Sequence, residues 1–180
     1  MLYFVRHGES QANVDNIFAG PTYYAPLTEN GRSQAAREAA RLQERGIKFD
    51  TIIASPIERA KDTSIIIAEG IGFDVDKIKF DQRLVEYDMG ALSGQSMMDV
   101  SPIERTSADG AENPELFKQR VTEVLDQASK IPGNTLLVSH AGVGRMIEVI
   151  RTDTDPARFY ELDGYPNAQV VELKPDTQKP

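Results

Sequence analysis

Short apolar runs alternate with longer stretches of helical period along nearly the whole chain. Each apolar run is three to five residues long, and the stretches between them carry apolar residues three and four positions apart. Strand and helix in alternation predict an α/β fold, here a three-layer α/β/α sandwich with a central, mostly parallel sheet. The expected strands are 2–5, 51–54, 78–80, 135–138 and 169–173, and the expected helices are 28–46, 56–70, 113–131 and one from about residue 142.

Two of the expected helices begin with a local start signal. Ser55-Pro56-Ile57-Glu58 fits a capping box with proline at the first helical position. Asn113-Pro114 repeats the order of cap and then proline before a stretch of helical period, and Pro132-Gly133 stops that helix. These signals support the alternation of strands and helices.

Length and composition exclude several classes of protein. With 180 residues, of which 40% are hydrophobic and 27% charged, we expect a single domain over residues 1–180. The net charge of -8 argues against a nucleic-acid-binding surface, which needs clustered Lys and Arg. The absence of cysteine excludes disulfides and cysteine nucleophiles. No apolar run is long enough for a membrane span or a signal-peptide core, so we expect no membrane partner and a cytoplasmic location.

Three apolar runs end in a polar residue just before a turn. The first continues into Arg6-His7-Gly8, the second into Ser55-Pro56 and the fourth into Ser139-His140. In open parallel sheets, ligands bind outside the carboxyl ends of the strands, so side chains at these ends meet in one crevice. We therefore expect His7, Arg59 and His140 to be neighbours.

The turns at these strand ends predict that the crevice binds an anion. Gly8 and Gly142 allow the backbone to approach a ligand closely. Helices that begin just after the turns direct free N–H groups and positive dipole ends toward the crevice. Because the chain as a whole is acidic, the positive charge that holds an anion has to be local.

The chain contains two histidines, His7 and His140, and both lie in these matching contexts. Two histidines without a third His, a Cys or a nearby carboxylate motif make a poor zinc site, so we expect no metal. A Ser-His-acid hydrolase is also disfavoured, because Ser139 lies in no Gly-x-Ser-x-Gly turn and adjacent side chains of a strand point to opposite faces. The histidines therefore favour a catalytic role at an anion site.

Four motifs along the chain resemble those of the histidine phosphatase superfamily, which contains cofactor-dependent phosphoglycerate mutases and many small phosphatases. In order, they are RHGES with Asn13 three residues on, SPIERAKDT, LVEYDMGALSG and VSHAG. Two further segments, PLTENG and GAEN, are similar to those that open helices in this family. The resemblance extends over nearly the whole chain.

The resemblance implies a phosphohistidine mechanism that uses neither a metal nor another cofactor. His7 matches the nucleophile that forms a covalent phosphohistidine, which water then hydrolyses. Arg6, Arg59 and His140 match the positions that hold the phosphoryl oxygens, and arginine suits phosphate by its forked geometry. Asn13 matches a further phosphate contact.

Glu86 matches the family's general acid, which protonates the departing alkoxide and then takes a proton from the attacking water. The implied substrate is a small phosphomonoester. Mutases of the family carry a longer segment after this motif, rich in basic residues that bind the glycerate carboxylate. Here 18 residues separate Gly94 from Asn113, and Arg105 is the basic residue among them. This departure favours a phosphatase and leaves a phosphoglycerate mutase or a non-catalytic phospholigand-binding module as alternatives.

The pentapeptide SPIER occurs twice, at residues 55–59 and 101–105. The first copy follows an apolar strand and leads into an apolar helix, whereas the second leads into TSADGAEN, which indicates a loop. We therefore expect Arg59 in the crevice. Arg105 is expected in a solvated loop, from which it could still reach a charged part of the substrate.

Two long connections, 14–27 and 89–113, are expected to shape the substrate pocket, because loops on a rigid scaffold often determine specificity. The alternative is that their large side chains pack only within their own loops. These side chains are Phe18, Tyr23, Tyr24, Met97 and Met98.

Overall fold

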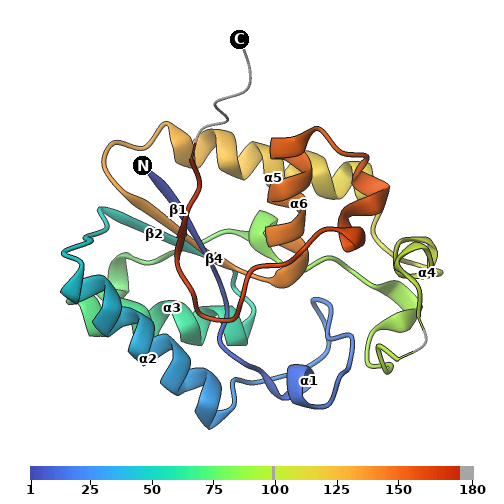
Figure 1. Cartoon of the computed structure of the whole chain (residues 1–180), viewed down its shortest axis with the longest axis horizontal. Helices are drawn as coiled ribbons and strands as arrows, with labels where there is room; N and C mark the ends of the chain where they lie inside the picture. Colours follow the sequence, from blue (N-terminus) through green and yellow to red (C-terminus); the bar gives the residue numbers. More distant parts are fainter. Residues whose placement is uncertain (99, 175–180) are drawn as a thin grey trace.

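The computed structural model describes residues 1–98 and 100–174, which form a five-stranded sheet in the order β3-β2-β4-β1-β5 (Figure 1). Strands β1 to β4 pair in parallel, and β5 pairs with β1 in the antiparallel direction. The strands are β1 (Leu2–Arg6), β2 (Thr51–Ala54), β3 (Lys79–Phe80), β4 (Thr135–Ser139) and β5 (Val171–Glu172). The predicted α/β fold with a mostly parallel sheet is confirmed.

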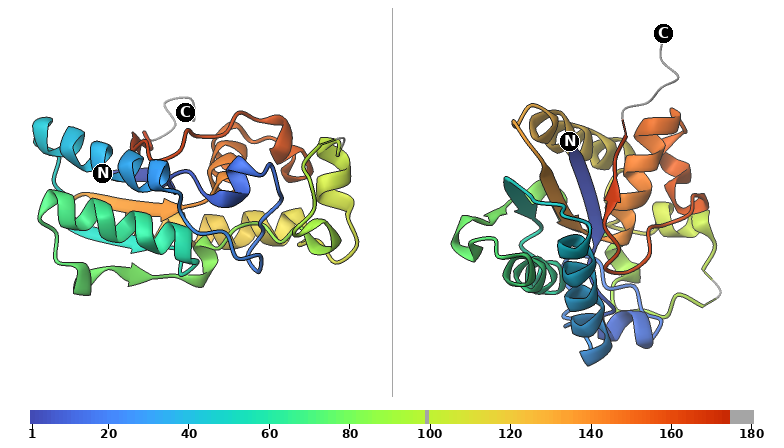
Figure 2. Two further views of the ribbon diagram at one scale, coloured as in Figure 1. Left: turned by 90° about the horizontal axis from the view of Figure 1, so that it is seen from below. Right: turned by 60° about the vertical axis from the view of Figure 1, so that its left-hand side comes forward.

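Two pairs of helices cover the two faces of the sheet (Figure 2). Side chains alternate along each strand, so Phe4 of β1 packs in one apolar cluster while Tyr3 and Val5 pack in the other. Both faces are covered, which explains why the parallel strands are continuous apolar runs. Helices α5 (Pro114–Ser129) and α6 (Ala141–Thr152) lie on the Phe4 side, and α2 (Glu29–Glu44) and α3 (Glu58–Ile71) lie on the other.

Helices α2 and α5 begin where their sequences predict. The Thr28 hydroxyl accepts a hydrogen bond from the Gly31 N–H at the start of α2. The Asn113 side-chain oxygen accepts from the backbone N–H groups of Glu115 and Leu116 at the start of α5. Each side chain satisfies N–H groups that have no partner within the helix.

The capping box expected at residues 55–58 is wrong. Helix α3 begins at Glu58, and its N-cap residue is Ile57, whose side chain forms no cap hydrogen bond. Ser55 is fully buried at the end of β2, where its hydroxyl lies 2.8 Å from Nε2 of His140. The same hydroxyl accepts from the Ile57 N–H at 3.3 Å, so the serine bonds to a distant segment of the chain and to the residue before α3 without forming the expected box.

The loop expected at the second SPIER is also wrong, because residues Pro102–Ser107 form helix α4. The Ser101 hydroxyl accepts from the Glu104 N–H, and the Glu104 carboxylate accepts from the Ser101 N–H at 2.7 Å. This is a complete capping box with proline at the first helical position, which forms from local bonds alone.

Several short helices have too few residues to show an apolar period, and the sequence did not predict them. Helix α1 and the 3₁₀ helix η4 contribute residues to the cavity described below, as does α4. The short elements other than α4 are α1 (Gln11–Val14), η1 (Val75–Lys77), η2 (Gln82–Leu84), η3 (Gly90–Leu92) and η4 (Pro156–Glu161).

The single domain over residues 1–180 stays a prediction, since residues 99 and 175–180 lie outside the described part. Within residues 1–98 and 100–174, no helix combines the length and the apolar character that crossing a membrane requires.

Candidate active site

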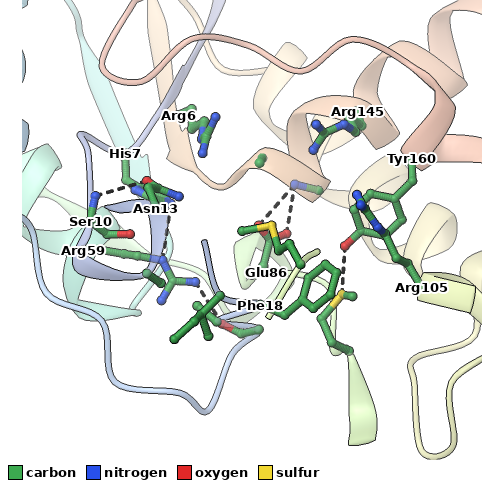
Figure 3. Close-up of a pocket in the computed structure, with 18 residues that line it drawn as sticks. Arg6, His7, Ser10, Asn13, Phe18, Arg59, Glu86, Arg105, Arg145 and Tyr160 are labelled. Carbon is green, nitrogen blue, oxygen red and sulfur yellow. Dashed lines mark hydrogen bonds between the residues drawn. The ribbon is translucent and has the colours of Figure 1, made fainter. Parts of the chain in front are cut away.

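Residues that follow β1, β2 and β4 meet around a cavity of about 140 Å³ (Figure 3). One of the predicted site residues, His140, is fully buried and does not line it, but its ring centroid lies 5.3 Å from that of His7. The structure therefore brings the predicted residues together at the carboxyl end of the sheet. Those that line the cavity are Arg6, His7, Asn13, Arg59 and Glu86.

His7 is held as a neutral imidazole with one nitrogen available to react. Its Nδ1 lies 2.7 Å from the Gly8 carbonyl oxygen, which accepts only from an N–H, so Nδ1 carries the proton. Nε2 then has the lone pair, and the Nε–H of Arg59 donates to it at 3.3 Å. Burial, followed by the charges of Arg59 and Arg6, lowers the pKa of His7 well below its ordinary value. This is the protonation state that a nucleophile requires.

His140 lies behind His7 and is fixed by Ser55. Its Nε2 lies 2.8 Å from the Ser55 hydroxyl, and its buried Nδ1 has no hydrogen-bond partner in the part of the chain that the structure describes. Burial, and then the charge of Arg59, lowers the pKa of His140 well below the ordinary value. His140 is therefore neutral, and its contact with phosphate stays a prediction.

Two arginines, the half-buried Arg6 and the buried Arg59, give positive charge to the side of the cavity that holds His7. Arg59 is 2% exposed and donates to the Gly20 carbonyl oxygen at 2.9 Å. Arg6 donates to the Tyr165 carbonyl oxygen at 3.4 Å, and its buried Nε has no hydrogen-bond partner among the described residues. In that same part of the chain, neither guanidinium forms an ion pair with a carboxylate. Such charges favour an anion in the cavity.

The carboxylate of Glu86 lies against the N-terminal end of α6. Its Oε1 and Oε2 lie 3.0 and 3.2 Å from the Gly142 nitrogen, and its Oε1 also accepts from the Tyr87 N–H. A Cβ at Gly142 would lie 2.3 Å from Oε1, so the carboxylate fits because residue 142 is glycine. The sequence predicts that a ligand approaches the backbone closely at this glycine, but in the structure the Glu86 carboxylate occupies that place.

At Gly8, too, the sequence predicts a closely approaching ligand, but in the structure the backbone of Gly31 lies there. A Cβ at Gly8 would lie 2.4 Å from the Gly31 carbonyl oxygen, in the first turn of α2. The glycine therefore allows the segment after β1 to pack against this helix, which fixes the neighbouring His7.

Asn13 lies on α1 and presents its amide to the cavity. Its Oδ1 accepts from the Ser10 N–H at 3.1 Å and from Nδ2 of Asn167 at 3.3 Å. Since the Ser10 N–H is a donor, the atom that faces it is the amide oxygen, and Nδ2 points the other way. Asn13 thus has a donor for an oxyanion, as its predicted role requires.

A second basic and aromatic group lines the other side of the cavity (Figure 3). The guanidinium carbon of Arg105 lies 5.2 Å from the ring centroid of Phe18 and 5.4 Å from that of Tyr160. The guanidinium carbon of Arg145 lies 5.6 Å from the Tyr160 centroid. Arg105 is half-buried on α4 and lines the cavity, so its expected place in a solvated loop is wrong.

The sequence matches the profile of the histidine phosphatase superfamily (branch 1) over residues 2–180. The chain belongs to this superfamily. A curated relative, the probable phosphoglycerate mutase GpmB of Escherichia coli O1:K1 / APEC, is 33% identical over an alignment of 164 residues that covers 83% of this chain and 74% of the relative. The resemblance that the four motifs predicted is confirmed.

Solved structures of the superfamily share the fold. Bacillus stearothermophilus YhfR superposes with a TM-score of 0.80 at 26% identity, over 98% of this chain and 92% of that one. The mycobacterial glucosyl-3-phosphoglycerate phosphatase in complex with VO3 gives a TM-score of 0.77 at 26% identity, over 94% of this chain and 90% of that one.

In this member of the histidine phosphatase superfamily, Arg120 of α5 fastens the segment that carries Glu86. Its Nη1 donates to the carbonyl oxygens of Arg83 and Val85 at 2.7 and 2.8 Å, and its Nη2 donates to that of Glu86 at 3.3 Å. Glu112 pairs with the same guanidinium at 2.7 Å. No local motif marks Arg120, because the three carbonyl groups that it holds lie about 35 residues away in sequence.

The sequence also missed Arg145, Tyr160 and Asn167. Arg145 follows the VSHAG motif, and a charged residue in the first turns of an apolar helix is a signal that could have found it. Tyr160 lies on the short η4, which has no apolar period. Asn167 donates to the His7 carbonyl oxygen at 2.8 Å from a segment without any motif.

The two long connections both contribute to the cavity and pair with each other. The Phe18 N–H donates to the Gln95 carbonyl oxygen at 2.9 Å, and the Gly94 N–H donates to the Phe18 carbonyl oxygen at 2.7 Å. Phe18 and Met97 line the cavity. The other large side chains of these connections, Tyr23, Tyr24 and Met98, are exposed and do not line it.

Among the residues that the structure describes, no group of three or more His, Cys, Asp or Glu side chains is placed to hold a metal ion. Arg6 and Arg59 are the groups that bring positive charge to His7.

Proposed function

We propose that this protein is a phosphatase that hydrolyses small phosphomonoesters through a covalent phosphohistidine on His7. The observation that carries this proposal is the neutral His7, whose unprotonated Nε2 lies 3.3 Å from Nε of Arg59, in a cavity where neither Arg6 nor Arg59 forms an ion pair with a carboxylate of the described residues. The fold it shares with glucosyl-3-phosphoglycerate phosphatase supports hydrolysis as the reaction.

In the first step, Nε2 of His7 attacks phosphorus while the bond to the ester oxygen breaks. Arg6 and Arg59 stabilise the charge on the three transferring oxygens, and Asn13 and His140 supply further contacts. Glu86 in its protonated form gives its proton to the departing oxygen, so the alcohol leaves neutral.

In the second step, water attacks the phosphohistidine and Glu86, now a carboxylate, takes a proton from it. The N–P bond breaks, inorganic phosphate is released, and His7 returns to the neutral form. The Gly8 carbonyl stabilises the positive imidazole of the intermediate, since it accepts from Nδ1 throughout.

A cofactor-dependent phosphoglycerate mutase is the second candidate, favoured by the 33% identity to a probable mutase. A mutase must exclude water from the phosphohistidine while the phosphoglycerate reorients. The short connection after Gly94 disfavours that role. Interconversion of 2- and 3-phosphoglycerate faster than phosphate release, after priming with 2,3-bisphosphoglycerate, would establish the mutase instead.

The phosphatase mechanism is tested by trapping the phosphoenzyme. Rapid quenching of the reaction with ³²P-labelled p-nitrophenyl phosphate should give an acid-labile, base-stable label on the peptide that contains His7. His7→Ala should remove the label and lower turnover by at least about a thousandfold, as removal of a covalent nucleophile does.

Glu86→Gln is the matched variant for this experiment. It should still accept the label from p-nitrophenyl phosphate, because p-nitrophenolate leaves with little help from an acid. Its phosphorylation by an alkyl phosphate should be far slower. Full turnover in His7→Ala would refute the mechanism, and equal losses with both esters would refute the role of Glu86.

A further inference from the structure

Of the residues that the structure describes, four guanidinium groups and one carboxylate line the cavity, and the guanidinium groups lie in two separate places (Figure 3). Arg6 and Arg59 lie with His7, where the transferring phosphate belongs. Arg105 and Arg145 lie on the opposite side around the ring of Tyr160. One phosphoryl group at His7 accounts for the first pair and leaves the second pair without a function.

The second pair is held in place by neutral groups. Arg105 donates from Nε to the Val100 carbonyl oxygen at 3.1 Å, and Arg145 donates from Nε to the Leu162 carbonyl oxygen at 3.0 Å. Within residues 1–98 and 100–174, neither forms an ion pair with a carboxylate. Both are half-buried, so their positive charge is only partly compensated by water.

The position of Glu86 gives the direction in which the substrate extends. In an in-line displacement, the leaving oxygen lies opposite the attacking Nε2 of His7, and the acid that protonates it lies beside that oxygen. Glu86 lies between His7 and the pair formed by Arg105 and Arg145 (Figure 3). The alcohol that leaves therefore extends past Glu86 toward these two arginines.

We propose that Arg105 and Arg145 form a second anion subsite, so that the preferred substrates carry a carboxylate or a second phosphate on the leaving alcohol. This inference rests on the proposed phosphatase function, because the first subsite is the phosphate site at His7. Arg105 and Arg145 bind the second anion through their terminal N–H groups while Tyr160 packs against both guanidinium groups.

Pairs of esters that differ in one anionic group test the subsite. One pair is 3-phosphoglycerate and glycerol 3-phosphate, and the other is glucose 1,6-bisphosphate and glucose 6-phosphate. The wild-type kcat/KM should favour the doubly anionic member of at least one pair by about tenfold or more. The pair that shows the preference distinguishes carboxylate from phosphate.

Arg105→Gln and Arg145→Gln should each lower that preference about tenfold, chiefly through KM. The control is Arg158→Gln, because Arg158 is exposed, pairs with Glu161 and does not line the cavity. It should leave the preference unchanged. A preference absent from the wild type, or equal in the wild type and both cavity variants, would overturn the subsite.

Binding measured without turnover separates this inference from the proposed function. In His7→Ala, calorimetric titration with both members of each pair should show the same preference, and adding Arg105→Gln or Arg145→Gln should remove it. Absence of a phosphoenzyme in the wild type would refute the proposed function. The titrations would still decide the subsite, because they require binding alone, and equal affinities within both pairs would overturn it.

Discussion

In the first copy of SPIER, Ser55 is buried at the end of β2 and its hydroxyl contacts His140. In the second copy, Ser101 is exposed and its hydroxyl caps α4. The two segments have the same sequence and form different bonds. The capping box formed where its serine is exposed, and it did not form where the serine lies within hydrogen-bond distance of a buried imidazole.

The two arginines differ in the same way. Arg59 is 2% exposed and donates to His7 and Gly20, both far away in sequence. Arg105 is half-buried and donates from Nε to Val100, five residues before it. The first copy follows β2, which lies inside the sheet between β3 and β4, whereas the second copy lies in a connection that contributes no strand to the sheet. The comparison shows that tertiary surroundings, rather than the pentapeptide, determine what each residue does.

The largest difference between the copies is expected in catalysis. Arg59→Ala should lower kcat/KM for p-nitrophenyl phosphate by at least about a hundredfold, because it removes a preorganised charge from the transferring phosphoryl group. Arg105→Ala should lower it by less than about tenfold, since this ester has no second anion. Steady-state kinetics of both variants decide the matter. Equal losses would contradict the assignment of Arg59 alone to the phosphate at His7.

The dependence of the unfolding free energy on pH should be sensitive to Arg59 of the first copy and insensitive to Arg105 of the second. Burial, and then Arg59, lowers the pKa of His7 and of His140, so below about pH 6.5 the unfolded chain binds protons that the folded chain does not. The free energy of unfolding should therefore fall as the pH drops below 6.5, by about 1.4 kcal/mol per pH unit for each histidine that stays neutral. Urea unfolding between pH 7.5 and 5.5 measures the slope.

The matched variants for this measurement are Arg59→Met and Arg105→Met. Removal of the charge at Arg59 should make the fall shallower, because one of the two main causes of the lowered histidine pKa is lost. Arg105 is not among these causes, so its variant should keep the wild-type slope. A slope that changes equally in both variants would show that Arg59 does not act on the histidines.

The smallest expected difference concerns the serines. Ser55→Ala should cost about 1–3 kcal/mol of unfolding free energy, because it leaves Nε2 of the buried His140 without its partner. Ser101→Ala removes an exposed helix cap and should cost about 1 kcal/mol or less. Urea unfolding at pH 7.5 compares the two. A larger loss for Ser101→Ala would restore the view that both serines act chiefly as caps.

The sequence by itself determined the layers of the fold. Burial of a strand or of one helix face leaves a regular spacing of apolar residues within that segment, which can be read along the chain. The alternation of strand-like and helix-like segments was therefore enough to predict a mostly parallel sheet covered on both faces. The starts of α2 and α5 were predictable for the same reason, because Thr28 and Asn113 bond to backbone groups within three residues.

The sequence also indicated the nucleus of the site. His7 and Arg59 lie near one another because the carboxyl ends of parallel strands meet at the same end of the sheet. The polar residues that follow the apolar runs mark these strand ends in the sequence.

Only the tertiary structure decided the rest of the cavity. Arg145 and Tyr160 meet Arg105 because α6, η4 and α4 pack beyond the sheet, and Arg120 reaches the segment of Glu86 from α5. No periodicity encodes these contacts, since a side chain that bonds across some 35 residues or more leaves no regular pattern along the chain. The second SPIER forms helix α4 instead of the predicted loop, because local hydrogen bonds cap it. Tertiary packing then places Arg105 of this helix against Phe18 and Tyr160 in the cavity.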